Sequence, residues 1–163
     1  MSPPMTIYSD LASAVAVAPR RSRRRPFAMV SLALALAVFA TACASPDEDH
    51  ATALVNRERA TSGRADLSSN VSLILVAQTW SNHLAQTGSL SHRTPLSAGA
   101  PDRWTKLAEN VGFGSSVNEV HGYFMNSPDH RANILDPAFN SIGVGVSVDG
   151  SGRVWVVEEF ATL

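Results

Sequence analysis

Apolar positions recur along this chain with two different periods, which predicts helices in its first part and strands at its end. Residues 50–62 are predicted to form a first helix, ended by Gly63. A longer helix is predicted from a cap at Ser68 or Ser69 to about Thr87, where another glycine follows. Its apolar residues recur at spacings of four, three and four, as one face of a helix requires: Leu73, Ala77, Trp80 and Leu84.

Alternation of apolar and small residues predicts a β-hairpin near the end of the chain. Residues 141–148 place aliphatic side chains on one face and only glycine or serine on the other. The turn of residues 149–152 leads into a returning strand that begins at Arg153. Because the small face carries almost no side-chain volume, another backbone can approach it closely. A third strand is predicted at residues 110–113, since two strands alone are marginally stable.

Three shorter helices are predicted between these regions. Residues 101–107 place a proline at the first helical position. Ser116 and Glu119 have the spacing of a capping box, and the helix that they start stops near Ser127. Ser127 can cap a further short helix that begins at Pro128. Helices followed by a hairpin indicate an α+β fold rather than an alternating α/β fold.

The first 42 residues are predicted to be a signal peptide for export. Five arginines between Arg20 and Arg25 precede residues 27–42, which carry no charge. This apolar stretch is shorter than the roughly 20 residues that a transmembrane helix needs, so a cleaved signal is favoured over an anchor helix. Residues 24–27 (Arg-Arg-Pro-Phe) also resemble a twin-arginine export signal.

Cys43 is the only cysteine, and it follows the small residues Ala-Thr-Ala in a pattern that resembles a bacterial lipobox. The resemblance implies lipidation of Cys43, whose acyl chains would hold the protein on the outward face of the cell membrane. The same residues satisfy the ordinary cleavage rule, so free secretion is the open alternative. Residues 43–50 are polar and acidic, which predicts a flexible tether. A single cysteine excludes a disulfide framework.

The charge balance differs between the leader and the rest of the chain. Residues 43–163 hold eight basic and thirteen acidic side chains, although the whole chain has a formal net charge of only −1. An acidic body without a basic stripe argues against nucleic-acid binding. The length of this body suits a single domain.

Three short segments carry the residue types of a functional site: Ser91-His92, Ala-Glu-Asn-Val at residues 108–111, and SPDHRANIL at residues 127–135. LVNRERATSG precedes them, and FNSIGVGV and VWVVEEF follow. In this order they resemble the bacterial branch of the CAP superfamily, the domain of cysteine-rich secretory proteins, antigen 5 and plant pathogenesis-related proteins. The resemblance implies a CAP domain over residues 51–163. It also implies an α-β-α sandwich whose small antiparallel sheet has about three strands.

The resemblance further implies a central cleft of two histidines and acidic residues, which binds a divalent metal in some family members. His92 matches the first histidine, Glu109 the acid and His130 the second histidine. Imidazole nitrogens and a carboxylate oxygen suit zinc or a similar ion. Because His130 lies near a helix N-terminus, the helix dipole favours the neutral imidazole that a metal needs. His92, Glu109 and His130 are therefore predicted to line the cleft and to be the metal ligands.

The chain departs from the family pattern at several positions. Ala108 replaces the glycine before the acid, and Phe124 stands where eukaryotic members have tryptophan. Ser127 stands where those members have a second glutamate, so this member of the tetrad is missing. Glu119 is the nearest acid upstream, but its position fits the capping box better. Glu158 could either protect a sheet edge or face the cleft, and the sequence leaves both open.

Each candidate also has a purely structural interpretation. His92 could be a solvent-exposed loop residue, and His130 could hold a loop as a hydrogen-bond donor. Glu109 could accept backbone amides. Asn110 and Asn133 resemble family positions where an amide satisfies buried backbone groups.

Two main classes of function follow from this sequence. The favoured one is a non-enzymatic, exported binding module of the cell envelope, because the chain has no G-x-S-x-G and no other nucleophile constellation. Its partner would be a lipid, a cell-wall component or an envelope protein. The alternative is a metal-dependent hydrolase of peptide or cell-wall bonds, in which His92 and His130 hold the ion. Glu109 would then have to be both third ligand and general base, and it cannot fill both roles. A structural envelope protein without a ligand is a third hypothesis.

Overall fold

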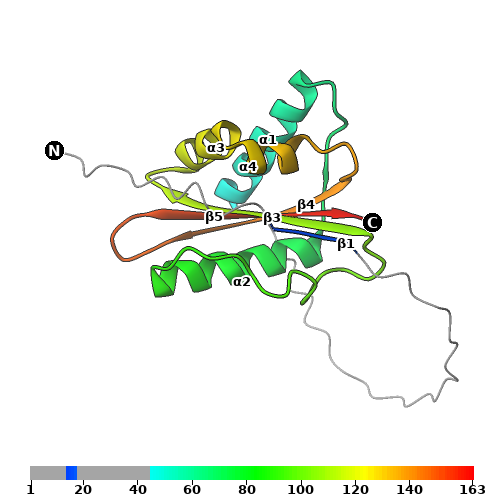
Figure 1. Ribbon diagram of the computed structural model, residues 1–163. Coiled ribbons are helices and arrows are strands. Elements are labelled where there is room, and N and C mark those ends of the chain that lie inside the picture. The colour runs from blue at the N-terminus through cyan, green and yellow to red at the C-terminus, as the bar shows by residue number, and fades with distance from the viewer. Residues whose placement is uncertain (1–13, 18–44) are drawn as a thin grey trace, which may run out of the picture.

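The computed structural model describes residues 14–17 and 45–163, which form three layers around one β-sheet (Figure 1). One long helix covers one face of the sheet, and the other three helices cover the opposite face (Figure 1). The single covering helix is α2 (Val71–Thr87), and the others are α1 (Pro46–Thr61), α3 (Val117–Asn126) and α4 (Pro128–Leu135). The predicted α+β class and α-β-α sandwich are confirmed.

The sheet has five strands in the order β1-β3-β5-β4-β2. They are β1 (Ala14–Val17), β2 (Ser68–Ser69), β3 (Lys106–Gly114), β4 (Ser141–Val148) and β5 (Val154–Thr162). The three long strands are antiparallel, and β4 and β5 form the predicted hairpin. The prediction of about three strands misses the two short edge strands, of which β2 runs parallel to β4.

Helix α1 begins inside the segment that is predicted to be a flexible tether, so that prediction is wrong from Ser45 onward. The Ser45 hydroxyl accepts a hydrogen bond from the Glu48 amide, and the Glu48 carboxylate accepts one from the Ser45 amide at 2.6 Å. Pro46 lies in the first turn of α1. The acidic residues that follow it stabilise the helix, because their negative charges lie at the positive end of the helix dipole. Cys43, the first residue of that tether, lies outside the described residues, as does the predicted signal peptide of residues 1–42 apart from β1.

Two other predicted boundaries need correction. Helix α2 is capped by Asn70, whose side-chain oxygen accepts hydrogen bonds from the amides of Ser72 and Leu73, while the predicted caps Ser68 and Ser69 form β2. The short helix predicted at residues 101–107 does not form, because β3 begins at Lys106 and continues for nine residues. Pairing along all of β5 favours this extended conformation over the local helix signal.

Glycines on β4 bring α2 unusually close to the sheet, as the small face of this strand predicts. A Cβ atom on Gly143 would lie 2.1 Å from the carbonyl carbon of Leu73. On Gly145 it would lie 2.3 Å from the carbonyl carbon of Ala77. Both distances are far below van der Waals contact, so the position of α2 on the sheet depends on the absence of these side chains.

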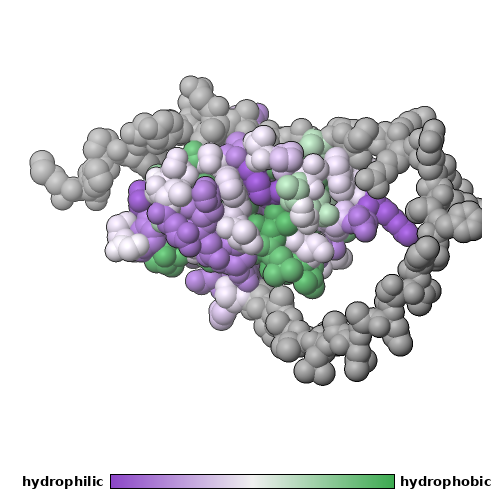
Figure 2. All heavy atoms as spheres, turned by 90° about the horizontal axis from the view of Figure 1, so that it is seen from below, coloured by the Kyte–Doolittle hydropathy of each residue, from purple (hydrophilic) through white to green (hydrophobic). Residues whose placement is uncertain are grey.

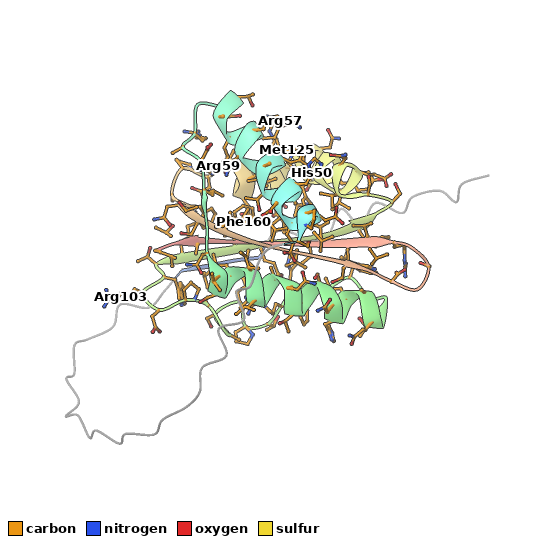
Figure 3. All side chains as sticks on the ribbon, turned by 180° about the vertical axis from the view of Figure 1, so that it is seen from behind. His50, Arg57, Arg59, Arg103, Met125 and Phe160 are labelled. Atoms are coloured by element: carbon orange, nitrogen blue, oxygen red, sulfur yellow. The ribbon has the colours of Figure 1, made fainter. Side chains whose placement is uncertain are left out.

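The hydrophobic core lies within the part of the chain from Ser45 to Leu163. From β1, Ala16 packs against one of the core clusters. Arg59, on α1, is 1% exposed and donates hydrogen bonds to the carbonyls of Ala65, Ile134, Asp136 and Phe139 (Figure 3). This buried guanidinium ties α1 to the connection between α4 and β4.

The outer face of α2 is chemically divided along its length. Figure 2 shows hydrophobic side chains over the N-terminal half of α2 and polar ones towards its C-terminal end. Val71 and Leu75 are more than half exposed there. A mainly apolar groove lies beside them, lined by Leu75, Val76, Trp80, Arg93, Ala98 and Gly99 among others. None of the described helices is both long enough and apolar enough to cross a membrane.

Candidate functional site

The three predicted site residues come from three different elements. His92 lies in the loop after α2, Glu109 lies on β3, and His130 lies in the first turn of α4. The Nδ1 atom of His92 is 2.7 Å from Oε1 of Glu109. The pKa of His130 is lowered, first by burial and then by the charge of the nearby His92. The fold therefore brings the two imidazoles together at β3, with Glu109 against the first of them.

Glu109 is fully buried, and its contacts define how it acts. Its Oε1 atom accepts a hydrogen bond from the backbone amide of Arg93 at 3.0 Å as well as from His92. Because the carboxylate oxygen of Glu109 accepts this hydrogen bond, the proton of the neutral His92 ring lies on Nδ1. The Nε2 atom then carries the free lone pair. Glu109 thus orients His92, as carboxylates behind metal-binding histidines do.

The Nε2 atoms of His92 and His130 are both buried and have no hydrogen-bond partner among the described residues. Buried polar atoms normally find a partner, so two such nitrogens at one site fit a bound ion. The described residues nevertheless contain no group of three His, Cys, Asp or Glu side chains arranged to hold a metal. The Oε2 atom of Glu109 is also buried and has no hydrogen-bond partner in this part of the chain, so each of the three predicted ligands presents one unpartnered polar atom. The set of His92, Glu109 and His130 stays a prediction.

A second buried carboxyl group lies directly beside Glu109. Glu159 on β5 is the register partner of Glu109, and it is 1% exposed. Arg93 lies across the pair, with its Nε atom 3.0 Å from Oε1 of Glu159 and 3.9 Å from Oε2 of Glu109. Burial and the charge of Glu109 raise the pKa of Glu159 well above its ordinary value, and Arg93 opposes this shift. Neither Arg93 nor Glu159 was predicted from the sequence to be part of the site.

Glu158 faces the opposite side of the sheet and belongs to a separate polar network. Its carboxyl oxygen accepts a hydrogen bond from Asn110 Nδ2 at 2.9 Å, and burial raises its pKa to about 8. Asn110 Nδ2 also donates to the His130 carbonyl, and Asn133 donates to Asn110 Oδ1. Because β5 lies between β3 and β4, the hypothesis that Glu158 protects a sheet edge is wrong. The amides of Asn110 and Asn133 have the expected structural role.

Glu119 locks the turn between β3 and α3. Its carboxylate accepts hydrogen bonds from the amide and hydroxyl of Ser115 and from the Tyr123 hydroxyl, which lower its pKa to about 2. The Ser116 hydroxyl accepts from the Glu119 amide, so half of the predicted capping box is present. Ser127 is the N-cap residue of α4, but its side chain makes no capping hydrogen bond.

The remaining histidines are engaged elsewhere. His83 stacks on Trp80 with ring centroids 4.6 Å apart, and His50 on α1 lies 2.9 Å from Oδ1 of Asn118 (Figure 3). His121 is buried on α3, and its Nε2 atom lies 3.9 Å from Oε1 of Glu58 on α1. None of these three belongs to the cluster at β3.

Residues 52–160 match the model of the CAP, or cysteine-rich secretory protein, family. The fold, the ordered segments and this match together define the chain as a member of the bacterial branch of the CAP superfamily. The chain is 32% identical over 111 residues to the uncharacterized protein YkwD of Bacillus subtilis. That alignment covers 63% of this chain and 42% of YkwD, so the chain spans less than half of that relative.

Solved structures share the same fold. An outer surface protein from Borrelia burgdorferi superimposes with a TM-score of 0.66 at 18% identity, over 71% of this chain and 92% of that protein. An extracellular SCP-domain protein of Bacillus anthracis has a TM-score of 0.61 at 22% identity, over 72% of this chain and 40% of the other. A cysteine-rich secretory protein of Staphylococcus aureus has a TM-score of 0.60 at 22% identity, with 72% and 39% covered.

Proposed function

We propose that this protein is an exported binding module of the bacterial cell envelope, whose cleft takes a divalent ion such as zinc between His92 and His130. The observation that carries the proposal is the pair of buried Nε2 atoms without hydrogen-bond partners among the described residues. Export is supported by the charged and then apolar leader and by structural relatives that are outer-surface or extracellular proteins.

The residues around the two histidines suit a cation. The lowered pKa of His130 keeps its imidazole neutral, and a neutral imidazole offers its lone pair to an ion. Glu109 holds His92 in the tautomer that presents Nε2. A bound ion would supply a Lewis-acidic centre with open positions for water or a ligand group. Two histidines, with Glu109 as the predicted third ligand, are fewer than the four ligands of a structural zinc site, so the site would bind zinc less tightly.

Binding is favoured over hydrolysis because a single carboxylate, Glu109, would have to fill two catalytic roles. Glu109 holds His92 and the Arg93 amide, and Glu159 is bonded to the Arg93 guanidinium. The Oε2 atom of Glu109 has no hydrogen-bond partner among the described residues, but Glu109 cannot be both a metal ligand and the general base for a metal-bound water. The ligand would be a lipid, a cell-wall component or an envelope protein, and the apolar groove beside α2 supports a lipid among these.

Attachment to the membrane would come from lipidation of Cys43, with residues 1–42 removed as the signal peptide. Mass spectrometry of the exported protein tests this step directly. A mass that corresponds to diacylated or triacylated residues 43–163 supports a lipoprotein. An unmodified mass that begins after Ala42 supports free secretion instead, and retention of residues 1–42 would overturn cleavage.

Calorimetric titration of residues 44–163 with Zn²⁺ tests the metal site. The variants His92→Ala and His130→Ala each remove one Nε2 atom, and His83→Ala is the control because His83 stacks on Trp80 away from the site. We expect one-to-one binding in the wild type and in His83→Ala, and loss of binding in the other two. Binding that survives both substitutions, or no binding to the wild type, would overturn the metal site.

A further inference from the structure

Strand β1 covers only part of the outer edge of β3, beside the candidate site. Residues 14–17 pair antiparallel with β3 in a register that sets Ala14 opposite Glu109 and Val17 opposite Lys106. In this register, Ala16 lies opposite Leu107 and packs against the cluster of Leu73, Leu96, Leu107 and Ala161. The edge of β3 therefore binds an extended segment in two ways. The backbones pair, and the side chain of one residue, Ala16, packs against the apolar cluster.

The segment that occupies this edge belongs to the predicted signal peptide. If residues 1–42 are removed on export, as proposed above, no other described strand takes the place of β1 beside Lys106–Glu109. An edge strand then presents a row of unpaired amide and carbonyl groups that can pair with another chain. The buried residues that form the three described core clusters lie between Ala51 and Ala161, so the exported form would keep them.

We propose that the outer edge of β3 in the exported protein is a binding site for an extended peptide segment of a partner protein, which adds to the sheet as β1 does. This inference rests on the export and cleavage proposed above. The segment needs a small uncharged side chain at the position of Ala16, because that position faces the Leu96 and Leu107 cluster. Charged side chains at that position would lose their hydration there.

The direction of pairing leads such a peptide towards the histidines. Because the strands are antiparallel and Ala14 pairs with Glu109, residues preceding the position of Ala14 would continue along Asn110–Gly114. Glu109 contacts His92, and Asn110 contacts the His130 carbonyl. The peptide would therefore pass beside both imidazoles, and the β3 edge and the histidine cleft would form one continuous binding surface.

A fluorescent peptide with the sequence of residues 11–20, LASAVAVAPR, tests the proposal on residues 44–163. Along a strand, successive backbone amides point alternately towards and away from the neighbouring strand. Two consecutive prolines, at Val15 and Ala16, therefore remove at least one amide that donates a hydrogen bond to β3. The matched control carries the two prolines at Leu11 and Ala12, outside the described pairing. A further pair compares Ala16→Asp with Ala18→Asp. All titrations are made in the presence of a chelator, so that the result does not depend on a bound ion.

We expect saturable binding of the parent peptide, at least tenfold weaker binding of the Val15/Ala16 proline peptide and of Ala16→Asp, and little change in both controls. Hydrogen exchange at Lys106–Glu109 should slow when the parent peptide is added. Equal affinity of the proline peptides, or no saturation at millimolar peptide, would overturn the proposal. Sedimentation showing that residues 44–163 form a dimer with protected β3 amides would also overturn it, since a second copy would then occupy the edge.

Discussion

Replacing Glu158 by glutamine should stabilise the protein at neutral pH and not at acidic pH. Burial raises the pKa of Glu158 from an ordinary value of 4.5 to about 8. Between these two pH values, the folded protein keeps the proton that the unfolded chain has released. The wild type therefore loses about 1.4 kcal/mol of folding free energy for each pH unit above 4.5, and the loss ends near pH 8.

The expected gain follows from the same numbers. At pH 7 the accumulated cost of keeping Glu158 protonated is about 3 kcal/mol, and a glutamine of the same shape does not have this cost. The amide oxygen of glutamine can still accept the hydrogen bond from Asn110 Nδ2. At pH 4.5 the two proteins should differ by less than about 1 kcal/mol, because the carboxyl group is then neutral in the folded protein and only half ionised in the unfolded chain.

Urea unfolding of residues 44–163 at several pH values between 4.5 and 7.5 measures this difference, with the fluorescence of buried Trp155 as the signal. Other titrating groups are common to both proteins and cancel when the curves are subtracted. Asp102→Asn, at an exposed position in the loop before β3, controls for the loss of a carboxylate and should change stability by no more than about 0.5 kcal/mol. A difference between the wild type and Glu158→Gln that stays constant with pH would refute the reasoning.

Three further predictions concern the packing that positions the site. Gly145→Ala should cost about 3 kcal/mol in urea unfolding, because its Cβ would clash with the α2 backbone, whereas Gly122→Ala in open space on α3 should gain roughly 0.5–1 kcal/mol. Equal effects would contradict the close packing. Arg59→Ala should cost about 3–5 kcal/mol, because four backbone carbonyls lose their donor, while Arg57→Ala on the exposed side of α1 should be near neutral. Burial lowers the pKa of His121, so below pH 6.5 the unfolded chain binds a proton before the folded protein does, and the wild type loses stability as the pH falls. His121→Phe removes this group, so the stability of the variant should fall less steeply below pH 6.5. An unchanged pH profile would contradict this role.

The long elements could be predicted from the sequence because one periodicity dominates each of them. The four-three-four spacing in α2 and the alternation in β4 leave little choice of conformation. The predicted ends of the helices and strands were wrong where the same residues fit two different local structures. The acidic segment after Ser45 has the composition of a tether and also of a helical first turn, and only the reciprocal capping bonds distinguish them. A two-residue parallel strand such as β2 has no sequence pattern of its own.

The candidate site could be predicted only in part. The resemblance to the CAP superfamily selects His92, Glu109 and His130, and the contact between His92 and Glu109 is present in the structure. The involvement of Glu159 could not be predicted, because the face on which an acidic strand residue lies depends on the pairing register with β3. Arg93 was missed for the same reason, since its partner Glu159 is 66 residues away in sequence.

Consecutive residues of β3 hold the two histidines from opposite faces of the sheet. Glu109 points to the α2 side and fixes the His92 ring, while Asn110 points to the α4 side and bonds the His130 backbone. Successive side chains of a strand always alternate in this way, so the register of β3 decides which residue faces each histidine. A slip of one residue would bury the amide against Arg93 and turn the carboxylate towards α4. The Asn110–Glu158 and Glu109–Arg93–Glu159 networks both oppose such a slip, which explains why polar groups are buried on each face at this point of the sheet.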